Sequence, residues 1–198
     1  MESVTVALLG NPNTGKSTLF QALTGVFQRV GNYPGCTVEK KIGPMALAGR
    51  RWRVIDLPGT YSLAPRSPDE MLSVDVLLGR QADVPPPDVI LCIVDASNVQ
   101  RNLFLVHQAL ELGRPLVVAL NMTDIAERRG LRVDAGRLSA QLGVPVIPIQ
   151  AHRRVGLEAL KEALSRAAGT EVQLRRSDFP PAFQGEVTSL SATLGGLG

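Results

Sequence analysis

Short apolar runs recur along the chain and alternate with segments in which apolar residues return every three or four positions. The runs are almost continuously apolar, and they cover Val4–Leu9, Val89–Val94, Leu116–Leu120 and Val144–Ile149. Strands that are apolar on both faces are typical of a parallel sheet with helices on both sides. The pattern therefore predicts an α/β domain built on a mostly parallel sheet.

The segments between these runs have helical periodicity, and several of them end at a glycine. Gly25 and Gly113 follow two of these segments directly, and glycine readily takes the left-handed backbone found after helix ends. We expect helices over residues 16–24, from Pro68 or Asp69 to Gly79, and over residues 101–112, 134–142 and 156–168.

Residues 37–55 have the pattern of a hairpin, with strands over 37–47 and 51–55 around the short turn Ala48-Gly49-Arg50. The first strand contains two lysines and Pro44, which favour the edge of a sheet because a proline cannot donate to the ladder. The predicted sheet therefore has six strands, one of them antiparallel at an edge. Residues 26–36, rich in Gly, Asn and Pro, are expected to form a loop.

The sequence changes character after residue 168, where paired arginines and prolines precede an end rich in Ser, Thr and Gly. Residues 1–168 are of ordinary length for one domain. We interpret residues 169–198 as a linker or tail, or as the start of an incomplete helical domain. The domain's core is expected to be aliphatic, because 44% of the chain is hydrophobic and only 4% is aromatic.

Charge and cysteine content narrow the function classes. The net charge is +3, and the arginine pairs lie apart without interleaved aromatic residues, so we expect no nucleic-acid partner. Cys92 lies in an apolar run and Cys36 in the expected loop, which favours a reducing cytosol over a disulfide scaffold. Because no signal peptide and no apolar run of about 18 residues occurs, we expect the chain alone to be soluble.

The first strand leads into Gly10-Asn11-Pro12-Asn13-Thr14-Gly15-Lys16-Ser17, the G-x-x-x-x-G-K-[ST] motif of a phosphate-binding loop. Gly15 lets the backbone approach a phosphate, and the helix that begins near Lys16 directs its positive end to the same place. We expect Lys16 to reach the β- and γ-phosphates and the Ser17 hydroxyl to bind Mg²⁺. An ordinary glycine-rich turn before a helix is the alternative.

A second motif, Asp56-Leu57-Pro58-Gly59, follows the second strand of the hairpin. The Asp56 carboxylate can hold a water molecule on Mg²⁺, and the N–H of Gly59 can meet a γ-phosphate. Thr37 lies between the two motifs and is the natural second hydroxyl ligand of Mg²⁺. Each of these residues alone could be structural, but together and in this order they predict one nucleotide site.

Asn121-Met122-Thr123-Asp124 follows another buried run and selects guanine over adenine. The Asp124 carboxylate can accept hydrogen bonds from N1–H and N2–H₂ of guanine, whereas adenine offers no such pair of donors. Asn121 would brace the loop, and Met122 would lie along the base. Ile149-Gln150-Ala151 could place the N–H of Ala151 at the guanine O6. The sequence therefore predicts GTP and GDP as ligands.

These motifs resemble the Ras-like GTPase superfamily and, more narrowly, the cytosolic G domain of the bacterial ferrous iron transport protein B family. The resemblance covers about residues 1–168 and rests on residues 10–20, 32–39, 56–63 and 121–124. Methionine in the guanine motif and the run Asp56-Leu57-Pro58-Gly59-Thr60-Tyr61-Ser62-Leu63 are its specific features. It implies the Ras-like P-loop GTPase fold, with a six-stranded mixed sheet and helices on both faces.

The resemblance also implies site residues beyond those argued above. Nucleotide contacts would include Asn11, Thr14, Thr18, Gly35 and Cys36. Asn13 would help to hold K⁺ beside the phosphates, where a cation can offset developing charge. The chain departs from the family at Cys36, where an apolar residue is more usual, and at Gln150, which replaces a Ser.

In such proteins the G domain is followed by a helical domain and then by a membrane domain that moves Fe²⁺. The resemblance therefore implies a location on the cytoplasmic face of the bacterial inner membrane and leaves homo-oligomers of the full-length protein open. Thr60 stands where Ras-type enzymes carry a catalytic Gln, so intrinsic hydrolysis should be slow. A ribosome- or tRNA-associated GTPase and a GTP-dependent docking module with little hydrolysis remain alternatives.

Overall fold

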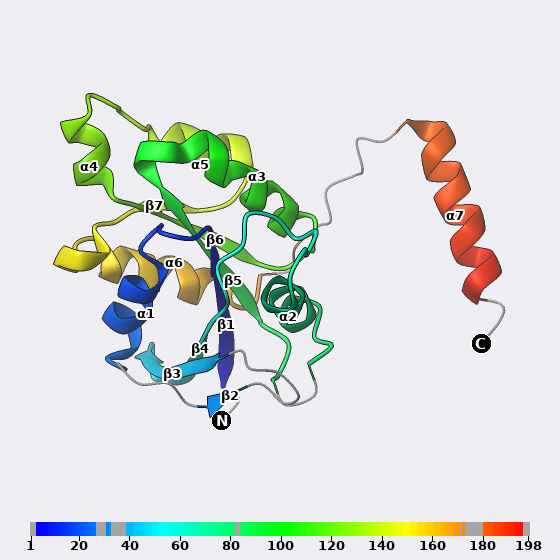
Figure 1. The fold of residues 1–198 in the computed structure, drawn as a ribbon, viewed down its shortest axis with the longest axis horizontal. Coiled ribbons are helices and arrows are strands. Elements are labelled where there is room, and N and C mark those ends of the chain that lie inside the picture. The colour runs from blue at the N-terminus through cyan, green and yellow to red at the C-terminus, as the bar shows by residue number, and fades with distance from the viewer. Residues whose placement is uncertain are drawn as a thin grey trace.

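A computed structural model describes residues 3–26, 31–32, 39–81, 84–170, 172 and 180–195 of the chain. Seven strands form its sheet in the order β2-β3-β4-β1-β5-β6-β7 (Figure 1). Their bounds are β1 Val4–Gly10, β2 Gly31–Asn32, β3 Glu39–Leu47, β4 Arg50–Asp56, β5 Val89–Asp95, β6 Leu116–Asn121 and β7 Val146–Pro148.

The pairing follows the expected mixed pattern. Strands β4, β1, β5, β6 and β7 run parallel to one another, and β3 pairs antiparallel with β4 from Lys41–Asp56 to Leu47–Arg50. The predicted Ras-like sheet of six strands is confirmed. The two-residue strand β2 pairs antiparallel with β3 and extends the edge, which the pattern of apolar residues could not indicate.

Most helices fall where the periodicity predicts them. The helices are α1 Lys16–Thr24, α2 Pro68–Leu77, α3 Val99–Leu110, α4 Thr123–Arg128, α5 Ala135–Leu142, α6 Leu157–Ala167 and α7 Pro181–Gly195, with 3₁₀ turns η1 Ala96–Asn98 and η2 Ala151–Arg153. The sequence did not predict α4 and α7. The first has six residues, too few for a periodic pattern. The second lies in residues 169–198, which were interpreted as a linker or tail or as the start of an incomplete helical domain.

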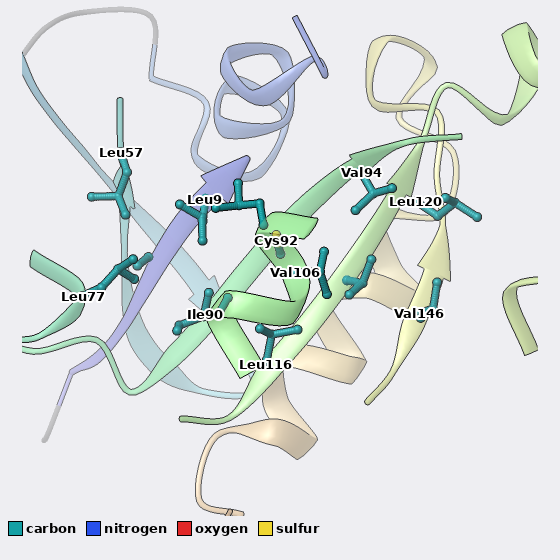
Figure 2. Packing of buried hydrophobic residues seen from close by; sticks show 14 of the residues in the cluster. Leu9, Leu57, Leu77, Ile90, Cys92, Val94, Val106, Leu116, Leu120 and Val146 are labelled. Atoms are coloured by element: carbon teal, nitrogen blue, oxygen red, sulfur yellow. The ribbon is translucent and has the colours of Figure 1, made fainter. Parts of the chain in front are cut away.

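The alternation of side chains along β1 divides the core between the two faces of the sheet. Ala7 and Leu9 belong to a cluster covered by α2, α3 and α5, which Figure 2 shows around Ile90, Cys92 and Val106. Val6 and Leu8 belong to the opposite cluster, covered by α1 and α6. Both faces of the central strands are therefore dry, which explains their continuous apolar sequence.

Cys92 and Trp52 are two buried core residues with polar atoms. Burial raises the pKa of the Cys92 thiol to about 12, so this predicted strand residue stays neutral and unreactive at physiological pH. Trp52 on β4 is 3% exposed, and its indole Nε1 donates to the carbonyl of Leu47 at 3.2 Å.

Helix α7 stands apart from the sheet in Figure 1. Its exposed apolar side chains include Phe183, Val187 and Leu190, spaced so that they lie along one face of the helix. Whether residues 169–198 begin a second, helical domain stays a prediction. Within the described part of the chain, no helix combines the length and apolarity needed to cross a membrane.

Candidate functional site

The predicted motifs gather at one edge of the sheet, because parallel strands direct their carboxyl ends to the same side. The loop after β1, the loop after β4 and the start of α4 after β6 meet there. The 3₁₀ turn η2 joins them from beyond β7 and packs against α1.

The loop from Asn11 to Gly15 has a tightly specified backbone. Asn13 and Gly15 both have positive φ, 66° and 87°, and the Thr14 hydroxyl donates to the carbonyl of Asn11 at 2.8 Å. A Cβ atom at Gly15 would lie 2.5 Å from Nδ2 of Asn121, so a side chain there would displace the neighbouring motif. This glycine is required for both its backbone conformation and the close approach.

The Asp56 carboxylate is 4% exposed and lies on the part of the site that contains the predicted phosphate-binding loop, which we call the phosphate side. Lys16, the first residue of α1, forms an ion pair with its Oδ1 atom. Lys41, directly opposite Asp56 in the β3–β4 ladder, places its Nζ atom 3.9 Å from Oδ2. One buried carboxylate is therefore held between two lysines, of which the sequence indicated only Lys16.

The backbone after Asp56 is held close to the phosphate loop. A Cβ atom at Gly59 would lie 3.3 Å from Pro12, and the N–H of Thr60 donates to the carbonyl of Gly10 at 3.2 Å. The Thr60 side chain turns inward, where its hydroxyl contacts the Ser62 carbonyl at 2.7 Å and Glu70 Oε1 at 3.1 Å. The hydroxyl at the Ras-type glutamine position is therefore committed to local structure.

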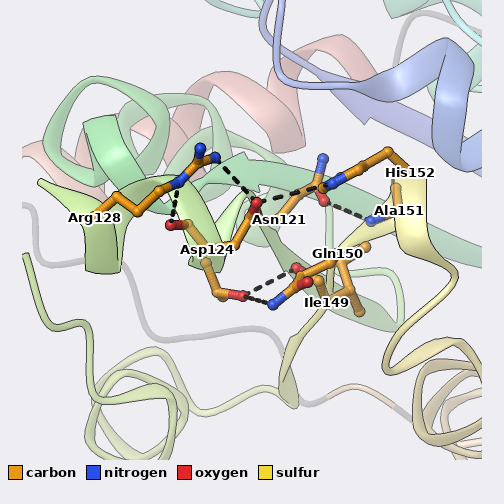
Figure 3. A network of polar contacts seen from close by, with 8 residues as sticks. Asn121, Asp124, Arg128, Ile149, Gln150, Ala151 and His152 are labelled. Atoms are coloured by element: carbon orange, nitrogen blue, oxygen red, sulfur yellow. Dashed lines mark hydrogen bonds and ion pairs between the residues drawn. The ribbon is translucent and has the colours of Figure 1, made fainter.

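Asn121 connects three segments of the site, and Figure 3 shows its contact with Ala151. Its Nδ2 donates to the carbonyl of Thr14 at 2.9 Å, and its Oδ1 accepts from the N–H of Ala151 at 3.0 Å. The side chain is 3% exposed, so both bonds are shielded from water. The expected bracing role of Asn121 thus has a defined geometry.

Asp124 presents its two carboxylate oxygens to different surroundings (Figure 3). Arg128 places Nη2 3.2 Å from Oδ2, and His152 places Nε2 3.8 Å from the same oxygen. The other oxygen, Oδ1, is buried and has no hydrogen-bond partner among the described residues. A buried acceptor without a donor is costly, so this atom is suited to a ligand N–H group.

Residues 150–155 form a closed loop whose ends pair with each other. The N–H of Gln150 donates to the carbonyl of Val155 at 3.1 Å, and the reverse bond measures 3.3 Å. The side-chain Nε2 of Gln150 lies 3.5 Å from the Thr123 hydroxyl, at the limit of a hydrogen bond. The polar side chains at positions 152–154 are exposed, as the sequence indicates.

The other predicted site residues differ in their exposure to solvent. Asn13, Ser17, Thr18 and Gly59 are exposed at the same edge, while Asn11 and Thr14 are buried. Met122 has a positive φ of 61°, and its Cε atom would lie 3.6 Å from a Cβ atom on Gly15. Gly35, Cys36 and Thr37 lie outside the described residues, so their roles stay predictions.

Several neighbours of the site were missed by the sequence reasoning. Arg128 could have been found, because it follows Asp124 by four residues and such pairs meet on a helix. Lys41, Glu70 and His152 come from other elements, and their contacts depend on tertiary structure that no local pattern encodes.

The residues fit the predicted ligands chemically. The unpartnered Oδ1 atom of Asp124 suits a guanine N–H donor. The absence of a side chain at Gly15 lets its backbone approach a phosphate. The hydroxyl of Ser17 and the carboxylate of Asp56 are oxygen ligands of the kind Mg²⁺ prefers. No group of three or more His, Cys, Asp or Glu side chains that could hold a metal occurs within the described residues, so Mg²⁺ would need oxygen atoms of a nucleotide as well.

Comparison with known proteins identifies relatives of this chain. A family model described as ferrous iron transport protein B matches residues 4–164. The Fe(2+) transporter FeoB of Escherichia coli strain K12 is 47% identical over 175 residues, which are 86% of this chain and 22% of that protein. The transporter of Salmonella typhimurium is 48% identical over 170 residues, covering 84% of this chain and 21% of that protein.

Solved structures of the same kind superpose closely. The cytosolic domain of L. pneumophila FeoB has a TM-score of 0.86 at 42% identity, over 98% of this chain and 81% of that one. The FeoB G-domain from Methanococcus jannaschii has a TM-score of 0.74 at 41% identity, over 86% of this chain and 100% of that one. A GMPPNP form of the T. maritima cytosolic domain has a TM-score of 0.85 at 36% identity, over 96% and 74% of the two chains.

The chain spans only about a fifth of the length of the curated transporters it matches.

Proposed function

The chain belongs to the ferrous iron transport protein B family, and we propose that its residues 1–168 bind and hydrolyse GTP. The domain would regulate a membrane part of the same protein that moves Fe²⁺, at the cytoplasmic face of the bacterial inner membrane. The 36%-identical T. maritima domain with GMPPNP supports the nucleotide class, because GMPPNP is a GTP analogue.

The observation that carries the proposal is the Oδ1 atom of Asp124, which is buried and without a hydrogen-bond partner among the described residues. A guanine base would satisfy it with N1–H and N2–H₂, while adenine would leave it unpaired. Asn121 supports this choice by joining the motif of Asp124 to the carbonyl of Thr14 and the N–H of Ala151.

The test is a change of base specificity. Asp124→Asn should lose GDP affinity and gain affinity for xanthosine diphosphate, whose altered donor pattern suits an amide. Calorimetry with both nucleotides measures this exchange. Asp134→Asn is the control, because Asp134 caps α5 through its bond to the N–H of Arg137. Unchanged GDP binding by Asp124→Asn would contradict the proposal.

Hydrolysis would be Mg²⁺-dependent and slow. Ser17, Thr37 and, through water, Asp56 would hold the metal ion, which supplies electrostatic stabilisation of the phosphates when bound. Lys16 and the N–H of Gly59 would contact the γ-phosphate, and the committed hydroxyl of Thr60 supports slow turnover. Thr37→Ala should spare GDP binding and sharply reduce phosphate release. A wild-type chain that binds GTP without releasing phosphate would instead favour a docking module.

Asn13 would add a K⁺ site beside the phosphates. Its exposed side chain and its φ of 66° are consistent with a loop position that faces a ligand. Phosphate release should then be faster in KCl than in NaCl at equal ionic strength, and Asn13→Ala should abolish that difference. A wild-type rate that does not depend on the cation would exclude the K⁺ site.

A further inference from the structure

The side chain of Asp124 contacts a residue of a separate element, His152. It belongs to the first turn of α4, whereas His152 belongs to η2 in the loop 150–155. The distance from His152 Nε2 to Asp124 Oδ2 is 3.8 Å, and Figure 3 shows the two side chains directed toward each other. This contact, which is an ion pair only when His152 is protonated, joins α4 to the loop beside the buried Asn121 bridge.

Arg128 has a different relation to the same carboxylate. It lies four residues further along α4, where Nη2 contacts Asp124 Oδ2 at 3.2 Å and Nε contacts the Asp124 carbonyl at 3.2 Å. Arg128 therefore moves with Asp124 if the loop departs. When residues 150–155 separate from α4, the His152 contact must break, together with the 3.5 Å contact between Gln150 Nε2 and the Thr123 hydroxyl.

We propose that His152 is a positioning residue that latches the loop 150–155 to Asp124 when its imidazole is protonated, and thereby slows the release of a bound guanine nucleotide. The proposal rests on the proposed guanine site. Closing the loop keeps Ala151 against Asn121 and leaves Oδ1 of Asp124 free for the base. A cationic His152 attracts the Asp124 carboxylate, while a neutral imidazole does so only weakly.

The charged groups around His152 favour attraction between its protonated ring and Asp124. Helix α4 presents Asp124 and Arg128, and Arg128 already shares the same carboxylate oxygen. Helix α1 packs against η2, and its charged residue Lys16 is paired with Asp56. The loop itself adds Arg153 and Arg154, both exposed. Asp124 is thus the anion that a charged His152 would contact. The nearby arginines are positive like the protonated ring, so they reduce its attraction to Asp124.

The experiment measures dissociation of a fluorescent GDP analogue from the whole 198-residue chain by stopped-flow at pH 6 and pH 8. Imidazoles change charge between about pH 5 and 8. The wild-type rate should be slower at pH 6 by about two- to fivefold, the factor that a half-exposed ion pair can supply. Association should change little, because such contacts act mainly on the off-rate.

Variants separate this effect from a general response to pH. His152→Gln should release fast at both pH values, and His152→Lys, a permanent cation, should release slowly at both. The matched control is His107→Gln, because His107 on α3 also faces a carboxylate, with Nε2 3.6 Å from Glu111 Oε1. This control should keep the wild-type ratio of rates. An unchanged ratio in His152→Gln would overturn the latch.

Failure of the analogue to bind the wild type would refute the guanine site itself. Binding with equal release rates at pH 6 and pH 8 would refute only the latch.

Discussion

The two sides of the candidate site are stabilised by different forces. On the base side, the buried amide of Asn121 makes two hydrogen bonds to backbone groups at 2.9 and 3.0 Å. On the phosphate side, the Asp56 carboxylate is held by charge, between Lys16 and Lys41. Hydrogen bonds depend strongly on angle and fix a geometry, whereas ion pairs tolerate a change of partner. The base side should therefore keep its shape through a GTPase cycle, and the phosphate side should reorganise.

The largest effect should come from breaking the base side. Asn121→Ala removes the partners of the Thr14 carbonyl and the Ala151 N–H, both in buried residues. Urea unfolding without nucleotide should show a loss of about 2–4 kcal/mol, the cost of two unpaired buried groups. Asn98→Ala is the control, since its side chain makes no capping bond to α3. Equal losses in both variants would remove the special role of Asn121.

A smaller effect is expected on the phosphate side. Asp56→Asn keeps the size of the side chain but leaves Lys16 and Lys41 without their anion. Their side chains are 13% and 34% exposed, so water can solvate the freed charges and the loss should be about 1–2 kcal/mol.

The same variant should no longer bind GDP more tightly when Mg²⁺ is added, which calorimetry with and without the ion would measure. A stability loss larger than that of Asn121→Ala would reverse the ranking of the two sides.

On the phosphate side, the Thr60 hydroxyl is expected to contribute to stability and not to hydrolysis. Thr60→Val keeps the shape but removes the bonds to the Ser62 carbonyl and Glu70, at a cost of about 1 kcal/mol in unfolding free energy. The rate of phosphate release per folded molecule should not change, because the hydroxyl faces inward. Thr60→Ser should restore stability. A slower release by Thr60→Val at full folding would instead assign the hydroxyl a role in hydrolysis.

The smallest effect is expected at Gln150. Its side chain reaches the Thr123 hydroxyl only at 3.5 Å, whereas the loop is closed by two backbone bonds to Val155. Gln150→Ser offers a hydroxyl that can brace the turn, so GDP dissociation should slow by about twofold, with association unchanged. Stopped-flow with a fluorescent analogue resolves this difference. If the off-rate stays the same, residue 150 has no part in the exit of GDP.

Sequence reasoning succeeded where the structure is local. The sheet was predicted, because strand periodicity depends on nearby residues. The motif also indicated that Asn121 joins neighbouring loops, as its two hydrogen bonds do, while the binding roles of the motif residues stay predictions. It could not predict that Lys41 shares Asp56, since this depends on the register of β3 against β4. Nor could it predict that Glu70 accepts the Thr60 hydroxyl, because that contact requires the turn before α2 to fold back.

The single tryptophan of the chain gives these comparisons an optical reporter. Trp52 is 3% exposed in the core between β4 and α1, and its indole donates to the Leu47 carbonyl of the same hairpin. Its emission should shift to longer wavelength when this hairpin opens to water. Because Trp52 precedes Asp56 by four residues on β4, a change in its emission reports unfolding of the strand that carries Asp56. A fluorescent nucleotide can then be followed at its own wavelength in the same sample.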